Sequence, residues 1–279
     1  MNSGMLKSRL PTPLRRRLGA AYRRVRREWQ WRTCSARLDL HATDATAFAY
    51  EVAAHASPVL RPLSGVDMRL QHNKASNLRI AVSRLDGLVL EPGHRLSFWK
   101  QVGNPSARRG YLPGLVLAHG QITEGIGGGL CQLTNLLHWM TLHTPLTVVE
   151  RWRHSYDVFP DAGRTVPFAS GATCAWPALD LQIENRTHTR FRLSVAVVGD
   201  DLRGTWSADL PATQTYRVYE AAHVITHDGP GVYHRRNILR RQVIDADGTA
   251  IDDHWLSDNH ARMCYDPELG AGPVRIPLA

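Results

Sequence analysis

At the centre of this chain a glycine-rich run, Gly125-Ile126-Gly127-Gly128-Gly129-Leu130-Cys131-Gln132, leads directly into Leu133-Thr134-Asn135-Leu136-Leu137-His138-Trp139-Met140. The leucines and the methionine of the second part recur at intervals of three and four residues, which predicts a helix with one apolar face. Cys131, Asn135 and His138 fall on the other face of that helix. The sequence therefore predicts a glycine turn that places one cysteine in the first turn of an amphipathic helix.

A cysteine in that position has the features of a nucleophile. The unpaired N–H groups at a helix start favour negative charge, so the pKa of the Cys131 thiol is expected to be lowered, and the thiolate is the reactive form. Gly127, Gly128 and Gly129 carry no Cβ, so a substrate backbone could approach them closely. Two alternatives stay open: a buried structural cysteine, and an anion cradle, although no Lys-Ser or Lys-Thr pair follows the glycines as a P-loop requires.

A thiol nucleophile needs a base within hydrogen-bond reach. His154 is the predicted base because it follows a strand-like segment, 147–151, that returns from the cysteine helix. His138 is on the Cys131 face but about 10 Å away along the helix, too far for a direct bond. Three residues could orient the His154 ring, and the sequence does not choose among them: Ser155, Tyr156 and Asp157.

Further residues complete the predicted site. Gln132 and Asn135 could donate hydrogen bonds to an oxyanion. Arg151 is also expected to bind the substrate. Glu150 and Arg151 are expected to form a buried pair that supports the site. Neither a metal nor a cofactor is expected, because the chain has no close Cys/His cluster.

The basic charge is concentrated at one end of the chain. Residues 1–38 carry a net charge of +10, whereas the remaining 241 residues carry −1. Apolar residues between Leu10 and Val25 recur at near-helical spacing, which predicts a basic amphipathic helix. Residues 1–33 could lie on an anionic membrane surface, pack on the body of the protein, or contact nucleic acid. The nucleic-acid interpretation is the weakest, because the body is neutral and shows no recognised motif.

The compartment is predicted from what the sequence lacks. No segment has the length and apolar content of a membrane span, which needs about 20 residues, or of a signal peptide. The cysteines are scattered without a C-x-x-C pair, which suits a reducing compartment: Cys34, Cys131, Cys174 and Cys264. We therefore expect a cytoplasmic protein, with docking at the inner membrane face as an option.

The fold class predicted is α+β, with the glycine-turn-to-helix cysteine site in a mixed domain and a β-rich C-terminal half. Helices are expected over 43–56 and 77–90. A β-hairpin is expected to join 216–225 to 233–244 across the turn at 228–231. The expected organisation has three parts: a basic arm over 1–38, a mixed domain over 39–200, and a β-rich extension over 201–279 packed on the same domain.

Several motifs, in chain order, resemble the VanW family, over about residues 73–198. They are Asn77 with Ile80 and Ala81, Glu91-Pro92-Gly93-His94-Arg95-Leu96-Ser97-Phe98, Val102-Gly103 with Arg109-Gly110-Tyr111, Gly127 through Leu133, Glu150-Arg151-Trp152-Arg153-His154-Ser155, and Asp180-Leu181 with Glu184-Asn185-Arg186-Thr187. Two stretches depart from the family pattern: Thr134-Asn135 after the Cys-Gln pair, and Gly163 through Phe168.

The resemblance implies a link to the cell wall and to glycopeptide resistance. Some members are associated with L,D-transpeptidase activity, a cysteine-dependent acyl transfer between peptidoglycan stems. The resemblance also matches His154 to the histidine of the family's "ER-x-x-H" motif. Two functions therefore stand as hypotheses: a cysteine acyltransferase acting on peptidoglycan-type or related amides, with Cys131 as nucleophile and His154 as base, and a non-catalytic binding or scaffold protein docked to the membrane by its arm.

Overall fold

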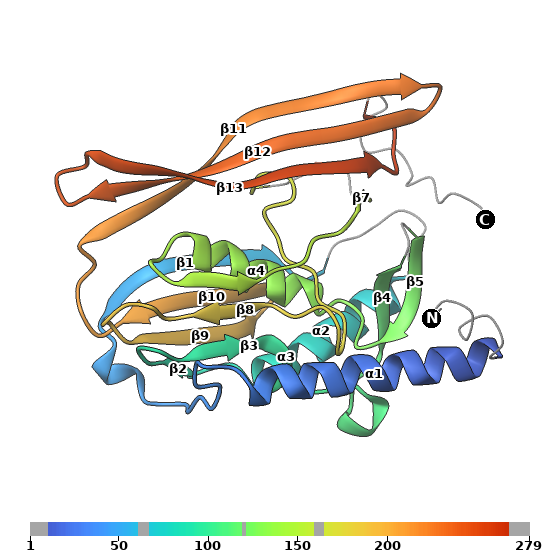
Figure 1. Ribbon diagram of the computed structural model, residues 1–279, viewed down its shortest axis with the longest axis horizontal. Coiled ribbons are helices and arrows are strands. Elements are labelled where there is room, and N and C mark those ends of the chain that lie inside the picture. Colours follow the sequence, from blue (N-terminus) through green and yellow to red (C-terminus); the bar gives the residue numbers. More distant parts are fainter. Residues whose placement is uncertain (1–10, 61–66, 119–120, 159–164, 268–279) are drawn as a thin grey trace, which may run out of the picture.

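The computed structural model of the chain describes residues 11–60, 67–118, 121–158 and 165–267, and it confirms a mixed α+β fold (Figure 1). The helices are α1 (Thr12–Arg32), α2 (Met68–Val82), α3 (Phe98–Val102) and α4 (Cys131–Leu142). The strands are β1 (Tyr50–Pro58), β2 (Val89–Leu90), β3 (Arg95–Ser97), β4 (Pro113–Ala118), β5 (Gln121–Ile126), β6 (Thr147–Glu150), β7 (Tyr156–Asp157), β8 (Gln182–Glu184), β9 (Phe191–Val198), β10 (Asp201–Ala208), β11 (Gln214–Gly229), β12 (Val232–Asp245) and β13 (Ala250–Met263). None of the helices in the described ranges is both long enough and apolar enough to cross a bilayer.

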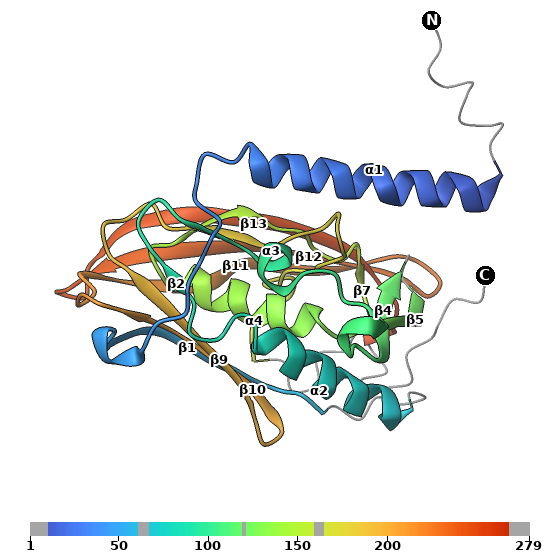
Figure 2. The ribbon, with the colours of Figure 1, turned by 90° about the horizontal axis from the view of Figure 1, so that it is seen from below.

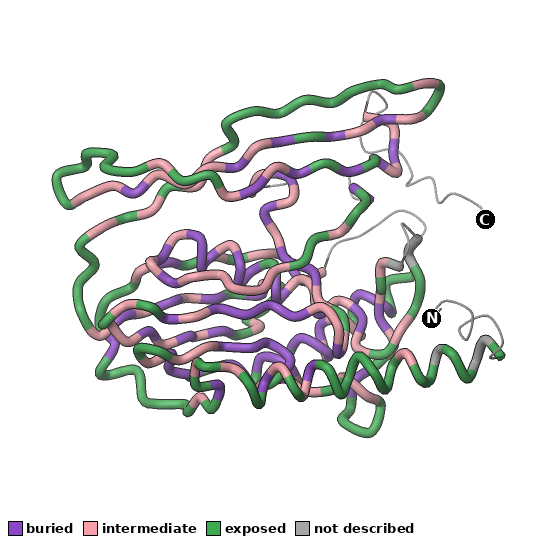
Figure 3. The backbone as a smooth tube through the Cα atoms, viewed as in Figure 1, coloured by how far each residue is buried: buried purple, intermediate pink, exposed green. Residues whose placement is uncertain are grey.

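The core lies between α4 and an antiparallel sheet of order β1-β10-β9-β2. Helix α4 approaches β10 so closely that a Cβ on Gly204 would lie 2.7 Å from side-chain atoms of Leu136 and Met140. Trp206 on the same strand is fully buried, and its indole Nε1 donates to Thr141 Oγ1 on α4 at 3.3 Å. The buried segments converge on this layer (Figure 3). The apolar face predicted for the cysteine helix is therefore the face that packs on the sheet.

A second sheet, with the order β11-β12-β13-β7, lies across the molecule from α1 (Figure 1). The hairpin predicted across 228–231 is confirmed by β11 and β12. The predicted division of the chain at residue 200 stays a prediction. Gly199 and Asp200 form the turn of the β9–β10 hairpin, and β10 is an inner strand of the central sheet. The chain passes to the second sheet only after Ala208. Parts of the predicted arm (1–10) and extension (268–279) lie outside the described residues.

Helix α1 lies along the outside of the body (Figures 1 and 2). Two side chains near its C-terminal end fasten it. Arg27 is buried and donates to both carboxylate oxygens of Glu150, at 2.6 and 2.7 Å. Trp31 donates from Nε1 to Ser97 Oγ at 3.0 Å. The predicted helical arm is therefore present and is attached to the body at one end.

Two predicted helices differ from the structure. Residues 43–56 contain one short 3-10 turn, Ala45–Ala47, and then strand β1. Their alanine content favours a helix locally, but the open edge of β10 accepts this segment in antiparallel register. The helix predicted to begin at Asn77 begins at Met68, where the Asp67 side chain caps Arg69 N–H at 2.8 Å, and it ends at Val82.

Candidate functional site

The glycine turn is built by contacts within the protein. Gly127 and Gly129 adopt φ values of 77° and 92°, which other residues rarely adopt. A Cβ on Gly128 would lie 2.2 Å from the backbone carbon of Gly114 in β4. Asn77 of α2, completely buried, donates to the Gly128 carbonyl at 3.0 Å. The turn is therefore pinned between α2 and β4, and the helix α4 starts from a fixed position.

The space beside these glycines is occupied by the chain itself. A Cβ on Gly127 would meet the Pro105 ring at 2.6 Å, and one on Gly129 would meet the Lys74 side chain at 2.2 Å. Close approach therefore explains why glycine stands at all three positions. The predicted contact of these glycines with a substrate stays a prediction, and the structure gives each of them a packing role.

Cys131 begins α4 and is partly buried beneath an extended segment, residues 170–175. Its Sγ lies 3.3 Å from Thr173 Oγ1, 3.6 Å from the Cys174 carbonyl oxygen and 3.9 Å from Cys174 Sγ. All four cysteines of the chain are free thiols. The structure thus places a second cysteine and a hydroxyl against the predicted nucleophile.

The surroundings of Cys131 favour the thiolate. The hydrogen bond from Cys174 lowers the pKa of Cys131 most, burial opposes it, and hydrogen bonding and charge from His154, together with Thr173, lower it further. The net effect holds the pKa well below the ordinary value of a thiol. Burial and the neighbouring Cys131 raise the pKa of Cys174 well above that value. These opposite shifts favour Cys131 as the anion of the pair and Cys174 as the hydrogen-bond donor.

His154 is among the groups that lower the pKa of Cys131, and its role as the base stays a prediction. It follows β6, which returns alongside α4, and its half-buried ring acts on Cys131 both as a hydrogen-bond partner and as a charge. Of the three residues proposed to orient the ring, Asp157 is bound elsewhere, because its Oδ2 accepts from Arg235 and from Tyr265 at 2.9 Å each. His138 is buried and bonds the Ser170 carbonyl at 2.7 Å. Burial, with the charge of Arg151, lowers its pKa to about 3, so it is neutral.

Residues around Cys131 hold the 170–175 segment in place. Thr134 donates to the Ala172 carbonyl at 2.6 Å, and Asn135 accepts from Ala172 N–H at 2.8 Å. Arg151 donates to the carbonyls of Gly171, at 3.0 Å, and Ala169. Asn135 and Arg151 therefore hold the 170–175 segment over Cys131. Their predicted contacts with substrate stay predictions. Burial, with the charge of Arg153, lowers the pKa of Arg151 to about 10.

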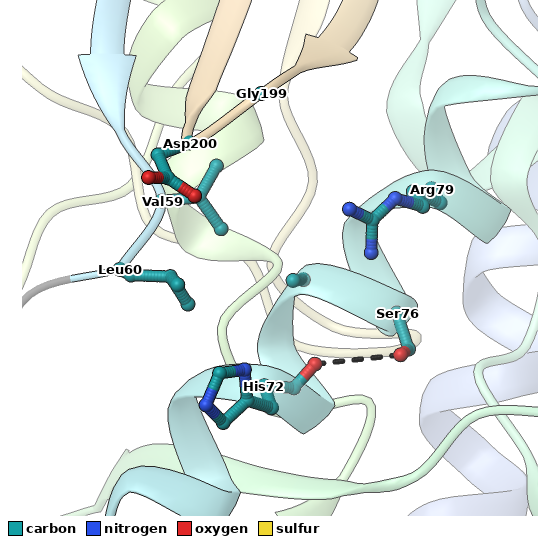
Figure 4. A pocket seen from close by; sticks show the side chains of 8 residues that line it. Val59, Leu60, His72, Ser76, Arg79, Gly199 and Asp200 are labelled. Atoms are coloured by element: carbon teal, nitrogen blue, oxygen red, sulfur yellow. Dashed lines mark hydrogen bonds between the residues drawn. The ribbon is translucent and has the colours of Figure 1, made fainter.

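Gln132 faces away from the thiol. Its Nε2 donates to Ser57 Oγ and the Pro58 carbonyl, both at 2.9 Å, at the end of β1. Just beyond lies a pocket of about 420 Å³ between the end of β1, α2 and the β9–β10 turn (Figure 4). Arg79 and Asp200 stand on opposite walls of this pocket in Figure 4. Neither Cys131 nor Gln132 is among its lining residues, so this pocket is distinct from the cysteine site.

Glu150 and Arg151 do not form the predicted pair. Successive side chains of a strand point to opposite faces, so Arg151 reaches the 170–175 segment while Glu150 reaches Arg27. Glu150 also accepts from Trp152 Nε1 at 2.8 Å and from Gln182 Nε2 at 3.0 Å. Burial raises the pKa of the neighbouring Asp180 to about 6, although hydrogen bonds from Ser97 and Trp99 oppose the shift.

Sequence reasoning missed Thr173 and Cys174 as site residues. They lie more than forty positions from Cys131 in the sequence, with no spacing that links them to it. The pairing of Thr173 N–H with the Trp152 carbonyl, at 2.8 Å, brings the segment beside the strand that carries His154. Only the backbone pairing reveals this proximity.

Comparisons with known proteins agree with the motifs. The sequence model of the VanW family, described as VanW like protein, matches residues 73–207. The Vancomycin B-type resistance protein VanW of Enterococcus faecalis is 33% identical over 202 residues, which is 72% of this chain and 74% of that protein. The chain belongs to the VanW family.

A second relative of this chain is the Bacillus subtilis protein YoaR, 27% identical over 114 residues. That match covers 41% of this chain and 36% of YoaR. No solved structure matches the chain. The VanW match contains the glycine turn, Cys131, His154 and Cys174, and it ends before β11, so the second long sheet lies outside it.

Proposed function

We propose that this VanW-family protein is a cysteine-dependent acyltransferase, with Cys131 as nucleophile and His154 as proton carrier. The observation that supports the proposal is the position of the Cys131 sulfur, which touches Cys174 and Thr173 and interacts with His154. These contacts favour the thiolate in a partly buried place, as expected for a nucleophile activated by an adjacent base.

The reaction would proceed in two steps. In the first step the Cys131 thiolate attacks the carbonyl carbon of an amide, a C–S bond forms, the C–N bond breaks, and His154 gives its proton to the departing amine. In the second step an acceptor amine attacks the thioester, its proton passes to His154, and the thiolate leaves. The acyl group is thus moved from one amine to another without oxidant, metal or cofactor.

The substrate class we propose is a peptide amide of the peptidoglycan type. The name of the Enterococcus faecalis relative connects that protein with vancomycin resistance, and the family resemblance connects Cys131 with peptide stems of the wall. Arg151 and Asn135 stand beside the 170–175 segment, where they could bind the polar backbone of such a stem.

The test is the formation of an acyl-enzyme. The full chain is mixed with an activated acyl ester, and intact-mass spectrometry follows the added acyl group. We expect one acyl group on Cys131, lost in Cys131→Ser and slowed in His154→Ala. Cys264→Ser is the matched control, because Cys264 is also a partly buried free thiol but lies in the C-terminal sheet region. Transfer is then measured by adding a stem-peptide amine.

The competing function is a non-catalytic binding or scaffold protein. It would give a different result: saturable binding of a stem peptide with no acyl group on Cys131, and the same affinity in Cys131→Ser as in the wild type. That outcome would refute the acyltransferase proposal.

A further inference from the structure

The outer face of helix α1 carries an apolar stripe that the protein does not cover. Its five members are exposed by between 43% and 67%: Leu14, Leu18, Tyr22, Val25 and Trp29. They recur every three or four residues, so they share an arc of about 80° on the helix. A large apolar stripe on a helix normally packs against the core, and one left in solvent marks an interaction site.

The attachment of α1 fixes the direction in which this stripe points. Arg27 and Trp31, which fasten the helix to Glu150 and Ser97, lie on the face opposite to the stripe. Helix α1 lies at the outside of the molecule in both views (Figures 1 and 2), and most of its length is coloured as exposed in Figure 3. The stripe therefore faces away from the body along the full length of the helix.

Arginines border the stripe on both sides. Arg15 and Arg26 lie along one edge, and Arg17 and Arg24 lie along the other. All four are exposed, and in the part of the chain that the structure describes none of them forms a salt bridge. Glu28 is the single acidic residue of the helix. The helix thus presents an apolar centre within a strongly positive border.

We propose that α1 is an interfacial helix that docks this protein on an anionic lipid bilayer. A bilayer surface accepts the apolar stripe among its acyl chains, while long arginine side chains extend to the lipid phosphates. Tyr22 and Trp29 are the side-chain types enriched at such interfaces. A second copy of the chain is a poor occupant, because two α1 helices face to face would bring arginine borders together. This inference is independent of the proposed acyl transfer.

The first test is sedimentation of the full chain with vesicles of three parts phosphatidylcholine to one part phosphatidylglycerol, and with pure phosphatidylcholine vesicles. We expect binding to the anionic vesicles and little to the neutral ones, with binding that weakens as salt is added. Leu18→Asp should weaken it by about tenfold or more, because it removes apolar burial and adds a repelled charge.

Leu210→Asp is the matched control, because Leu210 has the same exposed fraction as Leu18, 52%, but lies between β10 and β11. It should leave vesicle binding unchanged. Arg26→Gln should weaken binding by about fivefold, and Arg217→Gln, an exposed arginine on β11, should not. Circular dichroism confirms that each variant is folded.

A second measurement locates the contact. Vesicles with brominated acyl chains should quench part of the tryptophan fluorescence of the wild type, and Trp29→Phe should remove that quenched part. The proposal is overturned if Leu18→Asp binds as the wild type does, or if binding to neutral vesicles is equal. It is also overturned if lipid-free wild type is a dimer that Leu18→Asp dissociates, which would make a second copy the occupant.

Discussion

At the scale of single residues, the reactivity of this protein rests on the contacts of one sulfur atom. Hydrogen bonds from Cys174, His154 and Thr173 together outweigh the burial that would otherwise raise the pKa of Cys131. The thiolate form is present above the lowered pKa and is lost as pH falls through it.

Alkylation by iodoacetamide should therefore be fast at neutral pH and slow only in acid, unlike a free thiol with a pKa of about 8.5. Peptide mapping of a protein with Cys34 and Cys264 replaced by serine reports Cys131 and Cys174 separately. His154→Ala should move the midpoint upward, whereas His143→Ala, a histidine bonded to the Trp139 carbonyl, should not. The same pH midpoint of Cys131 alkylation in His154→Ala and in the wild type would contradict the pairing of Cys131 with His154.

Cys174 donates a hydrogen bond to the Cys131 sulfur. Replacing it tests whether that hydrogen bond or the packing of the side chain lowers the pKa of Cys131. Cys174→Ala removes the hydrogen bond to the Cys131 sulfur, so the pKa of Cys131 should rise. Cys174→Ser keeps a hydroxyl donor in a similar volume and should keep the pKa low. If the two variants alkylate with the same pH midpoint, Cys174 acts on Cys131 through packing alone.

At the scale of elements, the glycine turn depends on close backbone contact. Gly128→Ala would place a Cβ 2.2 Å from the Gly114 backbone, so β4 must move, at a cost of about 1–3 kcal/mol. Urea unfolding measures the loss. Gly19→Ala in α1 is the control, because its nearest neighbour is the flexible end of Arg23 at 3.4 Å, and alanine favours a helix. Equal stability of Gly128→Ala and the wild type would contradict the close contact.

The attachment of α1 depends on a buried ion pair. Arg27→Met leaves Glu150 without its cation and should cost about 3–5 kcal/mol of unfolding free energy. Arg26→Met, the adjacent exposed arginine, should cost little. Thermal unfolding of the two variants compares them directly, and similar midpoints would mean that α1 is not held by Arg27.

The elements predicted most accurately from the sequence are those whose partner is local. The cysteine helix, strand 147–150 and the hairpin across 228–231 follow from periodicity and turn residues close at hand. Residues 43–56 could not be assigned in this way, because β1 exists through pairing with β10, about 150 residues later. The same holds in the site. His154 follows from a motif near Cys131, whereas Cys174 enters through long-range contacts.

At the scale of the whole molecule, the second long sheet is joined to the segment that carries His154. Arg235 of β12 donates to Asp157 at 2.9 Å, and both side chains are buried. Arg235→Met should therefore cost about 3–5 kcal/mol and alter Cys131 alkylation through the 154–158 segment. Arg236→Met, which removes an exposed pair with Asp258, should do neither. Unchanged alkylation in a destabilised Arg235→Met would show that the sheet supports the fold but not the site.

A continuous chain of contacts runs from the outer helix to the sulfur. Arg27 binds Glu150, Glu150 accepts from Trp152, the Trp152 carbonyl accepts from Thr173, and Thr173 touches Cys131. These links set the distance between the Cys131 thiol and a membrane surface on which α1 would lie. A substrate anchored in the same membrane would have to place its scissile bond at that distance from the surface. The length of the tether between the anchor and the scissile bond would then help to decide which substrates react. A tether that is too short cannot reach Cys131, and one that is too long lowers the effective concentration of the scissile bond at the thiol.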